Sequence, residues 1–201
     1  MGAFNQTSTA SRHAIASRLM RFRLASVILL SLMLILFEPL SSTLAWMLAG
    51  FSLFFVSDTF CALLPNKKQF SFVASLAAIA CLSKFYWLQL HGEMVWWLPA
   101  LLVAAGVILL LLFLPLLDSL IFPATVMGGM LLQLAWASGE IWLSEQSSLP
   151  LGGFVACLIL IASKLILAIH HYRTPLRYGE ACFSGLYVFS LTLMASATMM
   201  A

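Results

Sequence analysis

Seven long apolar stretches, separated by short polar or proline-containing segments, dominate the chain. At about 1.5 Å per residue, each could form a helix that crosses most or all of the roughly 30 Å hydrocarbon layer of a membrane. Lipid offers no hydrogen-bond partner to an open backbone, so helices are the structures expected for such stretches. We predict helices at residues 24–37, 43–64, 69–90, 94–114, 119–138, 151–169 and 181–199.

The composition places the chain among membrane proteins. Hydrophobic residues make up 63% of its 201 residues and charged residues only 8%, and the mean hydropathy is +1.04. These values predict an all-α, polytopic transmembrane helix bundle, with residues 1–20 as a polar, mobile cytoplasmic tail and residues 21–201 as a single transmembrane domain. The first apolar stretch also has the features of a signal peptide that ends near Ala45, and the sequence leaves that alternative open.

Basic residues predict the orientation of the bundle. They fall in three segments, before the first helix, between the second and third, and between the sixth and seventh: Arg12, Arg18, Arg21 and Arg23; Lys67 and Lys68; Arg173 and Arg177. Seven spans place all three segments on one side of the membrane, which the positive-inside rule makes the cytoplasmic side. The tryptophans map near the other side, as an interfacial aromatic belt does. We therefore predict a cytoplasmic N-terminus and a C-terminus on the opposite side.

Three ionisable residues lie inside apolar stretches, namely Asp58, Lys84 and Lys164. An ionisable group within a membrane span is costly and is a functional-site candidate by default. The dipeptide Ser57-Asp58 corresponds to Ser163-Lys164 in a weak parallel internal repeat, which would put Asp58 and Lys164 at one depth. Two interpretations stay open. The two residues form an ion pair that fixes helix register, or they line a polar cavity in which Asp58 handles protons.

Other features carry less information about function. Lys84 lies near the outer end of its helix, where it can extend its ammonium group to the interface or pair with Glu140. Gly128 and Gly129 suit close helix packing. The four cysteines have no metal-ligand spacing and are predicted to be small buried hydrophobes. Signatures of soluble hydrolases and nucleotide-binding proteins are missing, and we expect no metal, no other cofactor and no nucleic-acid partner.

A series of short motifs follows in order along the chain: Ser57-Asp58, Leu64-Pro65, Ser83-Lys84, Gly139-Glu140-Ile141-Trp142, the segment from Gly153 to Lys164, His171-Tyr172-Arg173 and Tyr187. Their order and spacing resemble the YhhN family of small bacterial membrane proteins, which is related to the animal lysoplasmalogenases. The resemblance covers nearly all of the hydrophobic part of the chain. Together with the asymmetry of the basic residues, it implies a multi-pass protein of the bacterial inner membrane, whose C-terminus would then lie in the periplasm.

The resemblance implies a lipid reaction, hydrolysis of the vinyl ether bond of a lysoplasmalogen to a fatty aldehyde and a glycerophospho-alcohol. Protonation of the vinyl carbon gives an oxocarbenium ion that water attacks, so the reaction needs a proton donor and a carboxylate. Asp58 matches the first acid of the family, and Lys164 stands where the second acid is expected. Around these two, the resemblance implies substrate-contacting or supporting residues: Ser57, Ser163, Lys84, Glu140 and Tyr187.

Three functions stay open at this point. The first is a lysoplasmalogenase-like hydrolase that uses Asp58, with a lysophospholipid as ligand. The second is a lipid-binding or structural membrane protein without hydrolysis, in which Asp58 and Lys164 form an intramembrane ion pair. The third is a small transporter. The chain departs from the family pattern at Lys84 and Ser190, which replace a histidine and a glutamine, and in lacking one preceding span. The sequence allows a monomer or a dimer.

Overall fold

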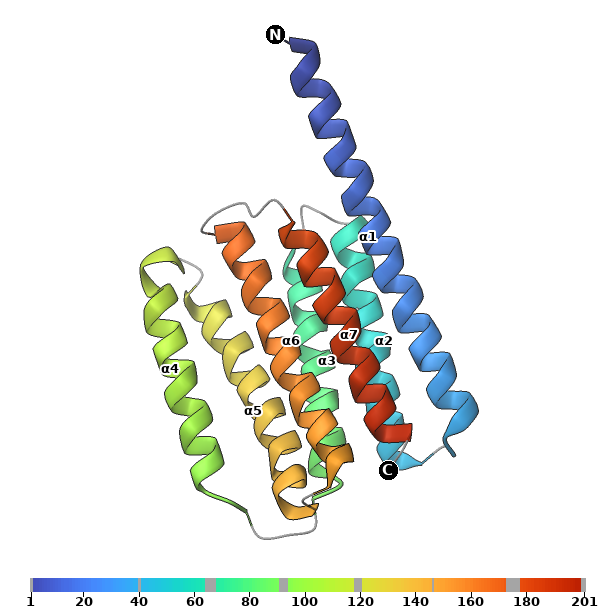
Figure 1. The fold of residues 1–201 in the computed structure, drawn as a ribbon, viewed down its shortest axis with the longest axis vertical. Helices are drawn as coiled ribbons and strands as arrows, with labels where there is room; N and C mark the ends of the chain where they lie inside the picture. The colour runs from blue at the N-terminus through green and yellow to red at the C-terminus, as the bar shows by residue number, and fades with distance from the viewer. Residues whose placement is uncertain are drawn as a thin grey trace.

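The computed structural model describes residues 2–39, 41–63, 68–90, 94–117, 121–145, 147–172 and 178–199. In these ranges the chain forms helices and no strands: α1 (Gly2–Phe37), α2 (Ser42–Leu63), α3 (Lys68–Trp87), α4 (Trp97–Leu117), α5 (Ile121–Glu145), α6 (Ser148–Tyr172) and α7 (Gly179–Met199). The helices run up and down in one bundle, with the two chain ends at opposite ends of it (Figure 1). The predicted all-α bundle is confirmed.

Six of the described helices are long and apolar enough to cross a membrane by length and composition. They are α2, α5, α6, α7, the part of α1 from Ser17 to Phe37 and the part of α3 from Gln69 to Trp87. The apolar stretch described for α4, Trp97–Leu112, is shorter. The chain is therefore a polytopic membrane protein. Which end of the bundle faces the cytoplasm stays a prediction from the basic residues.

The ends of two helices differ from the prediction. Helix α1 begins at Gly2, so the segment expected to be a tail is helical and extends the first span beyond the rest of the bundle (Figure 1). Helix α5 continues to Glu145 instead of ending at residue 138, which places Glu140 inside a helix rather than in an outer turn. The sequence pattern does not predict such extensions, because a polar residue can lie either in a loop or in a helix where its side chain is hydrogen-bonded.

Prolines explain where three helices begin. Pro99, Pro123 and Pro150 each lie in the first turn of a helix, α4, α5 and α6 respectively. Amide groups in a first turn have no intrahelical acceptor, so proline removes no hydrogen bond there and sets the backbone angle in advance. Pro150 is also a turn signal in the sequence, and α6 begins two residues before it, at Ser148. Helix α2 has a polar cap instead, in which the backbone N–H of Leu44 donates to Ser41 Oγ at 3.0 Å.

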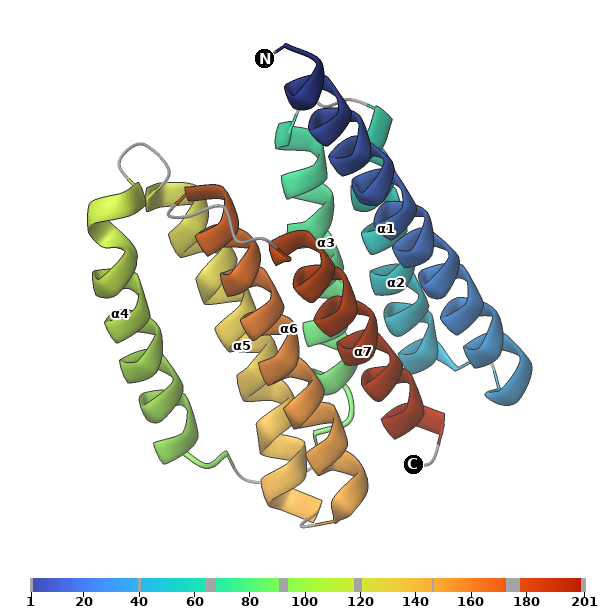
Figure 2. The same ribbon diagram turned by 45° about the horizontal axis from the view of Figure 1, so that its top comes forward.

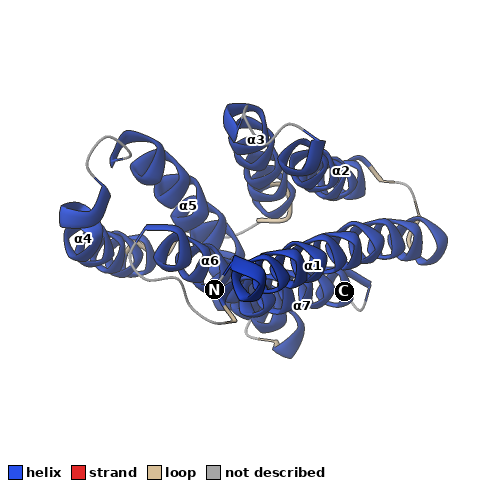
Figure 3. Ribbon diagram, turned by 90° about the horizontal axis from the view of Figure 1, so that it is seen from above, coloured by secondary structure: helices blue, strands red, loops and turns tan. Residues whose placement is uncertain are grey.

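The helices pair in a pattern that separates α2 from α6. Helix α2 packs on α3, α6 packs on α5 and α7, and α3 contacts α5. Helix α1 lies against α2 and α7, and α4 contacts α5 at the edge of the bundle (Figures 2 and 3). Seen from above, α2 and α3 lie on one side and α6 and α7 on the other (Figure 3). The helices that carry Asp58 and Lys164 are therefore not a packed pair.

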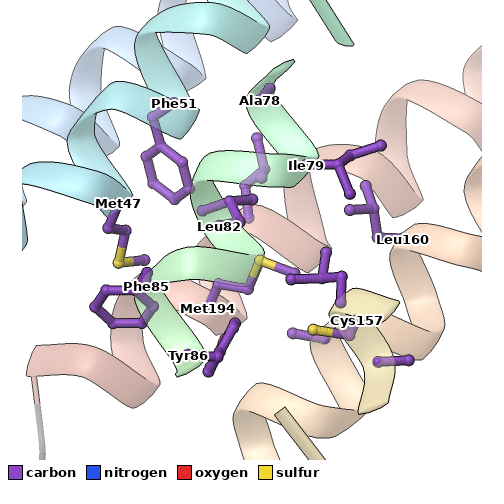
Figure 4. Close-up of a cluster of buried hydrophobic side chains, with 14 of the residues drawn as sticks. Met47, Phe51, Ala78, Ile79, Leu82, Phe85, Tyr86, Cys157, Leu160 and Met194 are labelled. Carbon is purple, nitrogen blue, oxygen red and sulfur yellow. The ribbon is translucent and has the colours of Figure 1, made fainter. Parts of the chain in front are cut away.

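The core consists of apolar side chains contributed by all seven described helices, and Figure 4 shows part of it. Phe51, Leu82, Leu160 and Met194 are completely buried. Lipid is as apolar as these side chains, so close packing rather than exclusion from water holds the helices together. Gly50 shows how close that packing is, because a Cβ atom there would lie 2.8 Å from Leu82 Cγ.

Candidate functional site

Asp58 is paired with Arg23, an arginine of α1. Arg23 Nη1 lies 3.6 Å from Asp58 Oδ1, and the two side chains are only 12% and 14% exposed. Two atoms of this pair are buried without a hydrogen-bond partner among the described residues. They are the acceptor Asp58 Oδ2 and the donor Arg23 Nε. Of the two interpretations of Asp58 and Lys164, the direct ion pair is therefore wrong, because the ion-pair partner of Asp58 among the described residues is Arg23. Helix α1 packs on α2 and its long arginine side chain reaches the carboxylate, whereas Lys164 acts on it electrostatically from farther away.

Lys164 lies among aromatic rings. Its Nζ is 5.6 Å from the ring centroid of Phe54, 5.6 Å from that of Phe183 and 5.5 Å from that of Tyr187. These three rings are buried, and we call them the aromatic cage. The rings of Phe54 and Tyr187 meet edge to face, and those of Phe183 and Tyr187 are stacked. Ring faces attract cations, and the attraction strengthens when water is excluded. The cage therefore stabilises an ammonium group inside the bundle.

Phe183 links the lysine to the ion pair. The Arg23 guanidinium carbon lies 4.9 Å from the Phe183 centroid, and Lys164 Nζ lies over the same ring. Both cations act electrostatically on the Asp58 carboxylate. We call Arg23, Asp58 and Lys164 the charge cluster. With two cations and one carboxylate it has a formal charge of +1, which suits an anionic ligand group such as a phosphate.

An apolar groove lies beside the charge cluster, on the far side of Lys164. It has a volume of about 320 Å³ and is lined by α4 between Val103 and Leu110, α5 between Ala124 and Leu132, and α6 between Ile161 and Ala168. Among the described residues of its wall, Lys164 is the charged one. The groove is partly open. Lys164 thus lies between the apolar groove, which it lines, and the Asp58 carboxylate, on which it acts electrostatically.

The serines that precede Asp58 and Lys164 have different roles. Ser57 Oγ donates to the Ser71 carbonyl oxygen at 2.8 Å and lies 2.8 Å from Ser75 Oγ, so it joins α2 to α3 next to Asp58. Ser163 Oγ is completely buried and donates to Leu160 of its own helix at 2.7 Å. Ser57 therefore positions the helix that carries the carboxylate, and the Ser163 hydroxyl group forms its hydrogen bond within its own helix. Tyr187 belongs to the site as a ring of the cage.

Glu140 and Lys84 lie outside the charge cluster. Glu140 is completely buried and accepts a hydrogen bond from Trp136 Nε1 at 2.8 Å and from the backbone N–H of Val95 at 3.1 Å. Of the two alternatives for Lys84, pairing with Glu140 is not formed, because these donors satisfy the carboxylate while Lys84 is exposed at the bundle surface. Glu140 thus ties α5 to the segment that leads into α4.

Replacing Glu140 by alanine is expected to destabilise the bundle by about 1–3 kcal/mol, because it leaves the Trp136 and Val95 donors without their acceptor. Glu140→Gln keeps a side-chain oxygen acceptor and is expected to cost less. Equilibrium unfolding in mixed micelles measures both variants. Equal losses for the two would mean that the negative charge, and not the acceptor, matters at this position.

Arg23 is the member of the charge cluster that the sequence does not single out. It lies in the basic segment before the first span, where the sequence indicates only the orientation of the chain. Its position in the sequence could have identified it. Arg23 is the last basic residue before the apolar stretch, so its side chain is the one best placed to reach into the bundle. The structure confirms none of the site roles, but it brings Asp58, Lys164, Ser57 and Tyr187 into one region and leaves Lys84, Glu140 and the Ser163 hydroxyl out of it.

Among the described residues, no group of three or more histidine, cysteine or acidic side chains could hold a metal ion. This includes the charge cluster. Of the cysteines, Cys157 is buried, Cys81 is half-buried, and Cys61 and Cys182 are exposed. The expectation that all four are buried is wrong for the last two, whose side chains lie on the outer faces of α2 and α7.

Comparison with known proteins identifies relatives along most of the chain. The YhhN family matches residues 19–198. Uncharacterized membrane proteins named YhhN from Escherichia coli O6:H1, Escherichia coli O157:H7 and Shigella flexneri are each 26% identical to the chain over 162 residues, which is 80% of this chain and 77% of the relative. No solved structure matches the chain.

Proposed function

Because the chain belongs to the YhhN family of membrane proteins, we propose that it is a lysoplasmalogenase-like enzyme, which hydrolyses the vinyl ether bond of a lysophospholipid in a bacterial inner membrane. One observation carries the proposal. Lys164 belongs both to the wall of an apolar groove and to a charge cluster that contains a buried carboxylate, Asp58. A single-chain ether lipid needs both surroundings, because its reactive bond lies where the hydrocarbon chain meets the polar part.

The charge cluster contains the two groups that the reaction requires. In the first step Lys164 donates a proton to the vinyl carbon that is not bonded to oxygen, which creates an oxocarbenium ion. The Asp58 carboxylate stabilises this cation and takes a proton from water as the water oxygen bonds to the cationic carbon. The resulting hemiacetal breaks its bond to the glycerol oxygen, its hydroxyl proton passes to that oxygen, and the aldehyde and the alcohol are released. Asp58 then returns the proton to Lys164.

Arg23 and the aromatic cage position these groups. Arg23 is ion-paired with one oxygen of Asp58, while the other oxygen, Oδ2, is free of hydrogen bonds to described residues. That free oxygen is the one we assign to water activation. The rings of Phe54, Phe183 and Tyr187 hold the lysine ammonium group in place without a hydrogen bond. They exclude water from its other side, which strengthens the electrostatic interactions of the cluster.

The absence of a second acid beside Asp58 favours a second function, which is lipid binding without hydrolysis. Asp58 is the one carboxylate in the charge cluster, since Lys164 stands where the family resemblance calls for another acid. A protein with this cluster could bind a lysophospholipid through its chain and phosphate without hydrolysing it. Both functions require the same ligand, so the difference between them lies in the products.

The test of the proposed function is aldehyde release by the purified full-length chain in lipid nanodiscs. We expect aldehyde from a lysoplasmalogen and none from the corresponding saturated ether lipid, which has the same shape but cannot form the oxocarbenium ion by protonation. Binding of the saturated lipid is measured in parallel. Binding of both lipids with no aldehyde from either would establish the second function and exclude the first.

A further inference from the structure

Two adjacent glycines of α5, Gly128 and Gly129, face open space. A Cβ atom built on either residue would meet no heavy atom within 4 Å, and both residues line the groove. The sequence suggested that these glycines allow close helix packing, and the structure shows that this is wrong. By contrast Gly153 does pack closely, since a Cβ atom there would lie 3.2 Å from the Tyr86 hydroxyl oxygen. The paired glycines keep the groove wide instead.

The dimensions of the groove match one hydrocarbon chain. Along α5 it extends from Ala124 to Leu132, which at 1.5 Å per residue is about 12 Å. One leaflet of a membrane has a hydrocarbon depth of about 15 Å, half of the total. The volume of about 320 Å³ lies at the lower end of the range for ligand pockets, roughly 300–1,000 Å³. A branched or two-chain lipid would need more space.

The polar features of the groove indicate where the charged part of a ligand would lie. Among the described residues of its wall, the polar side chains are those of Lys164 and Thr125, and the Thr125 hydroxyl group donates within its own helix to Ile121 at 2.8 Å. Lys164 is therefore the charged group that the described wall offers to a ligand. Behind Lys164 lies Arg23, and together these cations outnumber the single carboxylate of Asp58. That excess positive charge complements a lipid phosphate.

We propose that the groove is the chain-binding subsite for one single-chain phospholipid, and that Gly128 determines whether the chain can enter. At 1.5 Å per residue, Gly128 lies about 11 Å from the start of α5 and Lys164 about 12 Å from the end of α6, and both residues line the groove. These helix ends belong to the end of the bundle where the chain begins (Figure 1). The lipid therefore enters from the leaflet on that side, which the basic residues predict to be the cytoplasmic leaflet.

This inference rests on the proposed function for the identity of the ligand, but it concerns binding rather than hydrolysis. A leucine at position 128 would extend from α5 into the groove and fill the space that the chain needs. The helix itself tolerates the change, because leucine favours helix more than glycine does. Gly185 of α7 is a matched control, since a Cβ atom there also meets nothing within 4 Å and the residue is not part of the groove.

The experiment uses the full-length chain in nanodiscs and a saturated ether lysophospholipid with a photoreactive diazirine in its chain. This probe cannot be hydrolysed by the proposed reaction. In the wild type we expect cross-links to the facing parts of α4, α5 and α6, located by mass spectrometry. Gly128→Leu is expected to weaken binding of the probe by about tenfold or more, while Gly185→Leu binds like the wild type.

Each outcome has a distinct meaning. Cross-links confined to other helices, or equal binding by Gly128→Leu and wild type, would overturn the chain-binding subsite whether or not the protein releases aldehyde. Loss of binding in Gly128→Leu from a protein that produces no aldehyde would support the subsite and overturn the hydrolase. If Gly128→Leu does not fold, the cross-linking pattern of the wild type decides the question alone.

Discussion

Aldehyde release from lysoplasmalogen is expected to fall by about 10²- to 10⁴-fold when Asp58 is replaced by asparagine, the range that a positioned acid–base group contributes. Asparagine has almost the same shape but cannot accept a proton from water or stabilise the oxocarbenium ion with a full negative charge. Binding of the saturated ether lipid should change much less, because the groove is not altered. The loss is therefore expected in kcat rather than in binding.

Glu140→Gln provides the matched control for this prediction. It makes the same acid-to-amide change at a buried position that lies outside the charge cluster and is tied to Trp136 and Val95. We expect its aldehyde release per folded molecule to equal that of the wild type. If Asp58→Asn retained full activity per folded molecule, Asp58 would have no part in the chemistry and the proposed mechanism would be wrong.

Arg23→Met is expected to destabilise the wild-type protein but to stabilise the Asp58→Asn variant. In the wild type, removing Arg23 deprives a largely buried carboxylate of its ion-pair partner. In Asp58→Asn, two cations lie over the Phe183 ring with no carboxylate to offset their charges, so removing Arg23 relieves their repulsion. Breaking a buried ion pair by removing one partner typically costs about 3–5 kcal/mol, and we expect Asp58→Asn to be near the upper end.

The free energy of unfolding of the two single variants and the double variant, measured in mixed micelles, completes the cycle. The double variant should be more stable than Asp58→Asn alone. Lys84→Met serves as the control, because it removes an exposed lysine and should change stability by about 0.5 kcal/mol or less. An Arg23→Met effect of the same sign and size in both backgrounds would show that Arg23 and Asp58 do not interact energetically.

The two predictions also separate chemistry from folding. If the double variant regains stability but releases no aldehyde, the loss of activity in Asp58→Asn comes from the missing carboxylate and not from a damaged bundle. The charge cluster would then act in both roles, since its residues hold three helices together and provide the groups proposed for the reaction.

Much of the architecture follows from the sequence alone. Long apolar stretches between prolines and polar turns predicted the helices, because lipid permits few other backbone structures. Asp58 stood out because a charge is costly in such a stretch. The ordered motifs identified the family, which the comparison confirms. The orientation in the membrane rests on the basic residues and stays a prediction.

The tertiary structure decided how the charges are paired and where a ligand fits. The sequence indicated the depth of Asp58 and Lys164 but not the direction around each helix, so it could not show that Arg23 reaches Asp58 first. Gly128 and Gly129 suit tight packing and open space equally well in sequence, and only the position of α4 at the edge of the bundle creates the groove. Glu140 likewise lies inside a helix because α5 continues past it. Hydropathy records how deep a residue lies, whereas a site depends on which helices are neighbours, and helix packing alone determines that.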